Sequence, residues 1–392
     1  MVKYVMKKLA ISTLGILVGL LLGYYVIFYT SILPFRIQTS SNILINPISP
    51  QKQVIGFLPY WLLGNASNDY SKYISTLTYF GLRIDTDGTI LKVTNRVEGE
   101  PGWVALNSGR AEPFLKEAEN KNLKLSLAVV NGSNQSIDEL ISDPIPHAKN
   151  FIEDVTPILN KYNFKDLNLD IEYTHTATSD ARKNFTTFVS EVRKMLNKNI
   201  SLTVEITGDD AVKPDLIDPK AMGKLADYIV LMAYDFHFPG SFVSGPVAPI
   251  SGAGIMSEYD VTSASEKAIS QIPSQKLILG IPLYGYEWES LSPNPRYATI
   301  PNSGVVASSR RAQELANSCS NCTVSYDKQA DERYLTYFNS QTNSYHIIFY
   351  PDKSSTVSKI NLANNLRLGG IALWALGYED STILIPLEGY GN

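Results

Sequence analysis

The feature that most constrains the fold of this chain is a repeated alternation between short apolar runs rich in β-branched residues and helix-like segments. Eight such runs follow one another, at residues 54–59, 76–82, 123–130, 167–172, 201–206, 228–235, 276–283 and 370–376. Helix-like segments begin near Gly109, Asp180 and Ser263, between runs. Strands that alternate with helices are typical of a parallel sheet buried on both faces. Eight strands favour a closed (β/α)8 TIM barrel over an open doubly wound sheet, whose Gly-rich first turn is missing here.

The interval between the seventh and eighth runs is too long for a single crossover helix. Residues 288–350, approximately, contain strand-like runs at 323–327, 333–338 and 345–350, joined by turns rich in Asn and Ser. We therefore expect a small α+β insertion between strands 7 and 8, at the mouth of the barrel.

The composition fits a folded, enzyme-sized domain. Of the 392 residues, 44% are hydrophobic and 18% are charged, which is typical of globular proteins. The formal net charge is -4, and lysines cluster only within the first eight residues, so we expect no nucleic-acid partner. We expect a monomer.

The N-terminal segment predicts a membrane anchor. Residues 9–29 carry no charge over a length that crosses a bilayer. Lys3, Lys7 and Lys8 precede this segment, so residues 1–8 are expected to be cytoplasmic and the chain beyond Thr30 to be exported. Residues 30–52 then form a linker, and residues 53–392 form the barrel domain outside a single-pass cell-membrane helix. The alternative is a cleaved signal peptide and a secreted protein.

The fourth run carries polar side chains on one face. Leu167, Leu169 and Ile171 alternate with Asn168, Asp170 and Glu172. Because side chains alternate along a strand, the apolar set packs beneath the helices and the polar set enters the barrel. Buried carboxyls are costly unless they perform a task, and barrel active sites lie where the strands end. The alternative, a solvated strand edge, conflicts with the parallel pattern.

Four ordered segments resemble a known family. KDLNLDIE (165–172) resembles the DGxDxDxE signature of family 18 glycoside hydrolases, the chitinase-like enzymes. MAYD (232–235), KLILGIPLYG (276–285) and GGIALWALGYED (369–380) are similar to its later strands. The resemblance, over residues 53–385, implies hydrolysis of β-linked N-acetylglucosamine polymers, chitin-like or peptidoglycan, without a cofactor or metal.

The resemblance also implies roles for individual residues. Glu172 matches the general acid, and Asp170 matches the residue that orients the 2-acetamido group of the substrate. The acetamido carbonyl then attacks the anomeric carbon, so that configuration is retained. Tyr234 would donate a hydrogen bond to the acetamido oxygen. The residues expected to bind the sugar are Asp235, Met232, Trp374, Asn168, Tyr60 and Trp61.

The sequence departs from the family pattern in places. Asn168 stands where the signature most often has Asp, and Lys165 and Asp166 replace its Asp-Gly. An Asn cannot share a proton with Asp170, so we expect a simpler pH dependence. The third run also lacks the usual SxGG, and both departures resemble bacterial members that act on spore or cell-wall peptidoglycan.

Other polar residues suggest minor features. Cys319 and Cys322 form a CxxC without the second ligand pair of a zinc site, so in an exported chain we expect a local disulfide. His175 and His237 lie near the candidate site but lack metal-binding spacing. A sugar-binding lectin or adhesin on the same barrel is the alternative function, disfavoured because the acid Glu172 is present.

Overall fold

The computed structural model describes residues 52–255 and 257–391. The predicted anchor (9–29), the residues before it and almost all of the predicted linker lie outside this range. Within the described residues, no helix has both the length and the apolar character needed to cross a membrane. The anchor, the membrane partner and the cell-membrane location therefore stay predictions.

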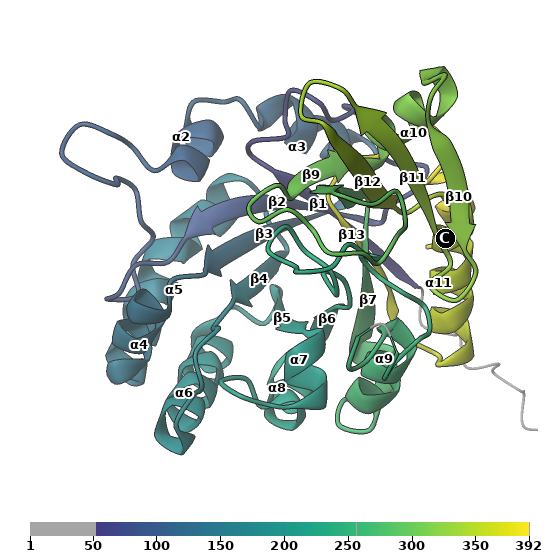
Figure 1. The fold of residues 1–392 in the computed structure, drawn as a ribbon. Coiled ribbons are helices and arrows are strands. Elements are labelled where there is room, and N and C mark those ends of the chain that lie inside the picture. Colours follow the sequence, from purple (N-terminus) through teal and green to yellow (C-terminus); the bar gives the residue numbers. More distant parts are fainter. Residues whose placement is uncertain (1–51, 256, 392) are drawn as a thin grey trace, which may run out of the picture. The chain divides into compact units, whose positions relative to one another are not determined.

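Eight parallel strands close into a barrel, as predicted (Figure 1). Around the barrel their order is β1-β13-β7-β6-β5-β4-β3-β2. The strands are β1 (Gln53–Pro59), β2 (Thr76–Arg83), β3 (Lys124–Asn131), β4 (Asp166–Ile171), β5 (Ser201–Thr207), β6 (Tyr228–Met232), β7 (Leu277–Pro282) and β13 (Gly370–Trp374). Each strand falls on one of the eight predicted runs.

Helices cover the outside of the barrel. They are α2 (Pro101–Asn107), α3 (Glu112–Asn120), α4 (Asn134–Ser142), α5 (Pro144–Lys161), α6 (Ser179–Met195), α7 (Gly208–Val212), α8 (Pro219–Leu225), α9 (Val261–Ile269) and α11 (Lys353–Asn365), with short 3₁₀ turns at Ser274–Lys276 and Ile385–Leu387. Polar residues cap several starts: Thr178 precedes α6, and Asp260 and Asp352 form capping boxes at α9 and α11. Helices α3, α6 and α9 begin within three residues of the starts predicted near Gly109, Asp180 and Ser263.

The two faces of each barrel strand bury different side chains. In β4, Leu167, Leu169 and Ile171 belong to the large core between strands and helices, which includes Phe151 of α5 and Phe188 of α6. A second, smaller apolar cluster fills the barrel interior with Ile55, Phe57, Phe80, Ala128, Val230, Ile278 and Ala372. The polar residues of β4 share this interior, which confirms the assignment of its two faces.

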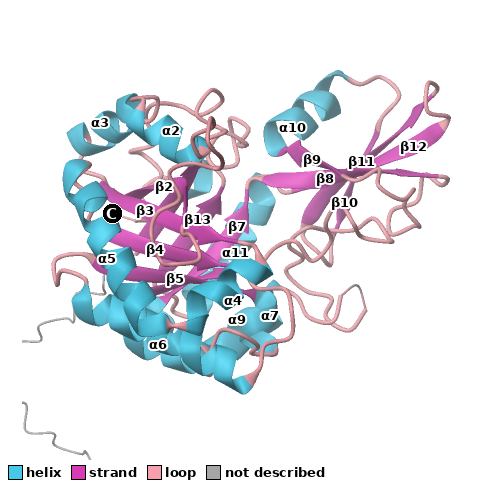
Figure 2. Ribbon diagram, turned by 90° about the vertical axis from the view of Figure 1, so that its left-hand side faces the viewer, coloured by secondary structure: helices cyan, strands magenta, loops and turns pink. Residues whose placement is uncertain are grey.

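The predicted insertion is a five-stranded antiparallel sheet with one helix, between β7 and β13. Its strands are β8 (Tyr284–Ser290), β9 (Val305–Ser308), β10 (Thr323–Asp327), β11 (Glu332–Asn339) and β12 (Ser344–Tyr350), and its helix is α10 (Ser309–Ser318). Figure 2 shows this sheet and α10 beside the barrel. The insertion begins four residues earlier than predicted because β8 follows β7 after a single residue, Leu283.

Buried contacts attach the insertion to the barrel loops. Both carboxylate oxygens of Glu332 accept backbone hydrogen bonds, from Val247 (2.8 Å) and Ala248 (2.6 Å). The indole nitrogen of Trp288 donates to the carbonyl of Phe238 (3.1 Å). Val247, Ala248 and Phe238 belong to the loop between β6 and α9, so the insertion forms one wall beside that loop.

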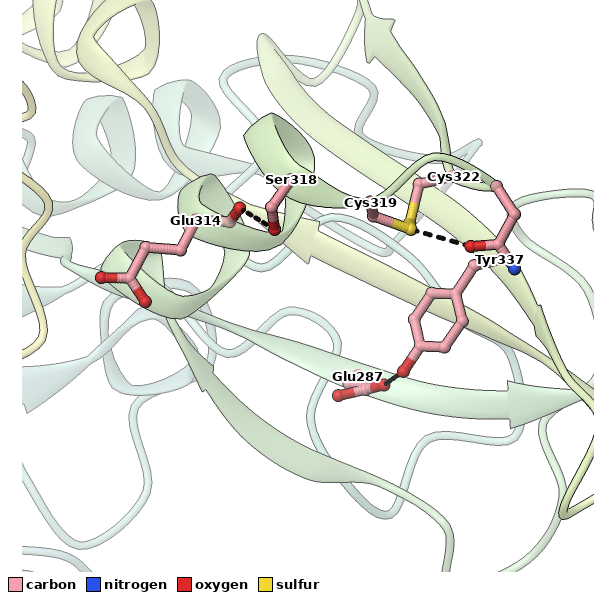
Figure 3. The surroundings of a disulfide bond; sticks show 7 residues. Glu287, Glu314, Ser318, Cys319, Cys322 and Tyr337 are labelled. Carbon is pink, nitrogen blue, oxygen red and sulfur yellow. Dashed lines mark hydrogen bonds between the residues drawn. A yellow bond between two sulfur atoms is a disulfide. The ribbon is translucent and has the colours of Figure 1, made fainter.

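The two cysteines are joined by a disulfide in the insertion (Figure 3). Cys319 directly follows α10, and Cys322 directly precedes β10, with Cα atoms 5.5 Å apart. Nearby, Glu287 of β8 accepts hydrogen bonds from Tyr337 (2.6 Å) and pairs with His346 (2.7 Å). The disulfide therefore closes a small loop at the edge of the insertion, away from the strands of the barrel.

Candidate active site

The predicted site residues converge at one end of the barrel. Glu172 directly follows β4, Asp235 lies three residues after β6, and Trp374 ends β13. All of these strands are parallel, so their carboxyl ends share the same opening. The insertion also leaves the barrel at this end, after β7.

A pocket of about 210 Å³ opens there. It brings together Glu172, Met232, Tyr234 and Asp235, which the sequence had placed in one site from two separate segments. The rest of its wall comes from residues not predicted for the site: Thr207, Gly208, Asp209, Phe236 and Tyr259. The pocket therefore lies between the ends of β4, β5 and β6.

Asp235 is held by two tyrosines of the insertion. Its Oδ1 accepts hydrogen bonds from the hydroxyls of Tyr284 (2.5 Å) and Tyr286 (3.0 Å), both on β8. Its backbone has a positive φ of 61°, an uncommon conformation for a non-glycine residue. Burial raises the pKa of Asp235, and the two tyrosine hydrogen bonds oppose that rise. Sequence reasoning missed both tyrosines, although they follow directly after the predicted seventh run.

Glu172 reaches the pocket from the end of β4. Its backbone N–H bonds the carbonyl of Asn131 (2.9 Å), and its side chain is exposed toward the opening. The surrounding walls still limit its hydration, which raises the pKa of Glu172, and the charges of Asp235 and Asp210 raise it further. Asp210 is fixed by the capping box of α7 with Thr207. This environment favours a protonated Glu172.

Asp170 lies deeper than Glu172 on the same face of β4. Only 4% of its surface is exposed, and its Oδ1 has no hydrogen-bond partner among the described residues. Burial, followed by the charge of Glu172, raises the pKa of Asp170 well above its ordinary value. A group in the pocket that offers a donor or a positive charge would therefore interact strongly with Asp170.

Asn168 lies on the same face of β4 as Asp170. It is fully buried below Asp170, and neither atom of its amide has a hydrogen-bond partner within the described part of the chain. Its side chain makes no hydrogen bond to Asp170. Direct contact between Asn168 and a sugar stays a prediction.

Aromatic side chains line the opposite side of the opening. The ring of Trp374 lies 4.5 Å from Phe80, 5.8 Å from Phe57 and 6.3 Å from Trp61, measured between ring centroids. Trp61 is 47% exposed, whereas Trp374 is half-buried. The peptide bond between Trp374 and Ala375 is cis. Together, Trp61 and Trp374 form an aromatic wall that a sugar ring could contact.

Tyr60 packs differently from its neighbour Trp61. Its ring lies against Gly81, where an added Cβ would come within 2.6 Å of the tyrosine. It also contacts the edge of Trp61, with ring centroids 4.9 Å apart. Tyr60 thus supports Trp61 from the barrel wall, and neither residue has a contact with the insertion among the interactions described. Direct contact between Tyr60 and a sugar stays a prediction.

A further carboxyl, Glu205, lies in the barrel interior and was missed by sequence reasoning. It is on β5, and only 2% of its surface is exposed. The signal was present in the run SLTVEI, where Thr203 and Glu205 alternate with buried apolar residues as Asn168 and Asp170 do on β4.

The two histidines near the site have other partners. His237 is buried, and its Nδ1 contacts the carbonyl of Pro246 (2.8 Å). His175 is exposed, with its ring 5.9 Å from that of Tyr173. Among residues 52–255 and 257–391, no group of three or more His, Cys, Asp or Glu side chains is arranged to hold a metal ion.

The sequence of this chain is similar to those of known glycosyl hydrolases. The sequence model described as "Glycosyl hydrolases family 18" matches residues 55–379. A cortical fragment-lytic enzyme of Bacillus anthracis is 26% identical over 326 residues, which cover 80% of this chain and 67% of that protein.

Solved structures share the fold. A Group IV chitinase of Ostrinia furnacalis, in complex with allosamidin, has a TM-score of 0.74 at 24% identity and covers 86% of this chain and 98% of its own. The spore cortex-lytic enzyme SleL of Bacillus cereus has a TM-score of 0.69 at 22% identity, covering 87% of this chain and 74% of its own.

Proposed function

Because this chain belongs to family 18 of the glycosyl hydrolases, we propose that it hydrolyses polymers containing β-linked N-acetylglucosamine, with Glu172 as the general acid. The observation that carries the proposal is the position of Glu172. It opens into the same pocket as Tyr234 and Asp235, at the end of β4, and its surroundings raise its pKa. A carboxyl with a raised pKa holds its proton to higher pH, which suits it to protonate a leaving oxygen.

The acid step breaks the glycosidic bond. The Glu172 proton passes to the glycosidic oxygen while the bond from that oxygen to the anomeric carbon breaks. The leaving sugar departs as an alcohol, and Glu172 becomes a carboxylate. The carboxylate can then accept a proton from the water that completes hydrolysis, which restores the starting state.

The nucleophile in this proposal is the 2-acetamido carbonyl of the substrate. Its attack on the anomeric carbon makes a positively charged ring. Asp170 lies two residues before Glu172, deeper in the barrel, where its carboxylate would stabilise that charge. Burial and the charges of the nearby carboxylates raise the pKa of Tyr234 well above its ordinary value, so the hydroxyl stays a neutral hydrogen-bond donor. Two displacements at one carbon retain the configuration.

The aromatic wall would hold the sugar over these groups. Trp374 and Trp61 present ring surfaces at the opening, and aromatic rings provide apolar contact area that suits a sugar face. Met232 lines the pocket, and Asp235 has a second oxygen available for sugar hydroxyls. We assign the cleavage subsite to the space between Trp374 and Glu172.

Two polymers fit this chemistry, chitin-like chains and the glycan strands of peptidoglycan. The similar proteins include a cortical fragment-lytic enzyme, a spore cortex-lytic enzyme and a chitinase. We favour a wall glycan, since the predicted N-terminal anchor would hold the barrel outside the cell, where such a substrate lies.

The test is a substrate screen with the full chain, purified in detergent. Chito-oligosaccharides and peptidoglycan glycan strands are incubated over a range of pH, and the products are identified by mass spectrometry. We expect release of shorter oligomers from at least one of them. Binding of both without cleavage at any pH would contradict the proposal and favour the sugar-binding alternative.

A further inference from the structure

A second buried carboxyl lies beside Asp170 in the barrel interior. β4 and β5 are paired in parallel, and the last partners in their register are Leu169 and Val204. The next positions along the two strands are Asp170 and Glu205. Adjacent strands are about 5 Å apart, so these two interior side chains are neighbours.

Neither carboxyl has a hydrogen-bond donor for its deepest oxygen. Within the described residues, Oδ1 of Asp170 and Oε1 of Glu205 are both buried and without a partner. A buried carboxylate that lacks a donor is costly, whereas one proton between two carboxyls supplies a donor to one and an acceptor to the other.

The charges that face Glu205 are all negative. Burial raises the pKa of Glu205 well above its ordinary value, and the charges of Asp170, Glu172 and Asp166 raise it further, whereas the nearby amide of Asn168 opposes the rise. Tyr234 faces it from the segment after β6, with a neutral hydroxyl. The apolar interior side chains of the other strands include Val230 and Ile278. No cation contributes to the environment of Glu205 among these groups, so the pair retains a proton.

Asp166 shows how a carboxyl is stabilised in this interior when it has only a structural role. It accepts hydrogen bonds from Ser126 (2.7 Å), Thr203 (3.0 Å) and Ser201, and Lys124 lies 3.6 Å away. Glu205 has no such set of partners: its Oε1 has none among the described residues, and only the amide of Asn168 lies against the carboxyl. A buried carboxyl with so few donors, next to the residue that stabilises the charged intermediate, is placed to act through that residue.

We propose that Glu205 is a positioning residue for Asp170 and holds, from the neighbouring strand, the single proton that the two carboxyls share. This rests on the proposed function. With the proton on Glu205, Asp170 is the anion that faces the acetamido-derived cation. If the proton moves to Asp170, Glu205 becomes the anion, and the pair keeps a total charge of -1 throughout.

The proposal departs from the expectation of a simpler pH dependence. That expectation assumed that Asp170 had no partner able to share a proton, because Asn168 stands on its own strand. Glu205 supplies the partner from β5, so the pair should titrate in two coupled steps.

The test compares three variants of the full chain by their pH profiles of kcat/KM on an N-acetylglucosamine oligomer. Glu205→Met removes both the proton and the donor, so Asp170 should ionise at higher pH. We expect the acidic limb of the profile to move up by about one pH unit. At pH values below the shifted limb, kcat/KM should fall roughly tenfold relative to the unaltered protein. Glu205→Gln keeps a donor and should retain the limb. Adding Asn168→Asp to Glu205→Met returns a carboxyl from β4 and should restore much of the loss.

The matched control is Asp166→Asn, which removes a carboxyl from the same interior but from outside the pair, and should move the acidic limb far less than Glu205→Met because Asp166 is the weakest of the charges acting on Glu205. Thermal unfolding checks that each variant folds. An unmoved acidic limb in Glu205→Met, or no recovery in the double variant, would overturn the role of Glu205. The proposed function would stand as long as the unaltered chain cleaves the oligomer.

A second measurement does not depend on turnover. Infrared spectra at neutral pH are compared in a Glu172→Gln background, which removes the proton of the acid itself. The band of a protonated carboxyl should remain there and should weaken when Glu205→Gln is added. If adding Glu205→Gln leaves the band unchanged, the proposal is wrong whatever the activity.

Discussion

Removing the Tyr284 hydroxyl is expected to change the ionisation of Asp235. Tyr284 is buried and its hydroxyl lies 2.5 Å from Oδ1 of Asp235, whereas that of Tyr286 lies at 3.0 Å. Tyr284→Phe keeps the ring and its contacts with Tyr234 and Tyr378. Only the hydrogen bond is lost, and that bond opposes the rise in the pKa of Asp235 caused by burial.

The size of the effect follows from the energy of the lost bond. A hydrogen bond to a charged group contributes about 1.5–3 kcal/mol, and about 1.4 kcal/mol corresponds to one pKa unit. Asp235 reaches solvent at the opening, which weakens the interaction, so we take the lower end. The pKa of Asp235 should rise by about one unit in Tyr284→Phe and by less in Tyr286→Phe, whose bond is longer.

Two assays measure this shift. In the pH profile of kcat/KM, the ionisation assigned to Asp235 should move to higher pH. The substitution also raises the pKa of Asp235 in the folded state further above its pKa in the unfolded state. The extra destabilisation is therefore absent at acidic pH and appears as the pH rises through the shifted pKa of Asp235. The melting temperature of Tyr284→Phe should match that of the unaltered protein in acid and fall below it near neutral pH. Equal profiles for both proteins, or a larger shift in Tyr286→Phe, would refute the reasoning.

Three further predictions concern the acid, the substrate and the anchor. Glu172→Gln keeps the shape but removes the transferable proton, so turnover of oligomers with poor leaving groups should fall by about 10²–10⁴-fold while binding survives; near-normal turnover would show that another group is the acid. De-N-acetylated oligomers should be inert because the nucleophile belongs to the substrate, and equal cleavage of both forms, measured side by side, would exclude that route. If residues 9–29 remain as an anchor, the mature protein should fractionate with membranes and keep its N-terminal lysines; a soluble protein that starts beyond Thr30 would contradict the anchor.

The sequence alone determined the barrel and the strand that carries its interior carboxyls. Eight apolar runs separated by helix-like segments specify parallel strands. The strands of such a sheet are buried on both faces, so both faces of each strand carry apolar side chains. The alternation in β4 placed Asp170 and Glu172 on the interior face, because side-chain direction repeats every two residues and depends only on the local chain. The strands of the insertion at 323–327, 333–338 and 345–350 were also visible as local runs.

Only the tertiary structure decided which of these side chains meet. Tyr284 reaches Asp235 across 49 residues of sequence, and Glu205 lies beside Asp170 because of the register between β4 and β5. The same packing buried Asn168 below the pocket and turned Tyr60 against Gly81. Alternation tells which face a side chain takes, but its neighbours across strands depend on register and barrel closure, which arise from the packing of the whole domain.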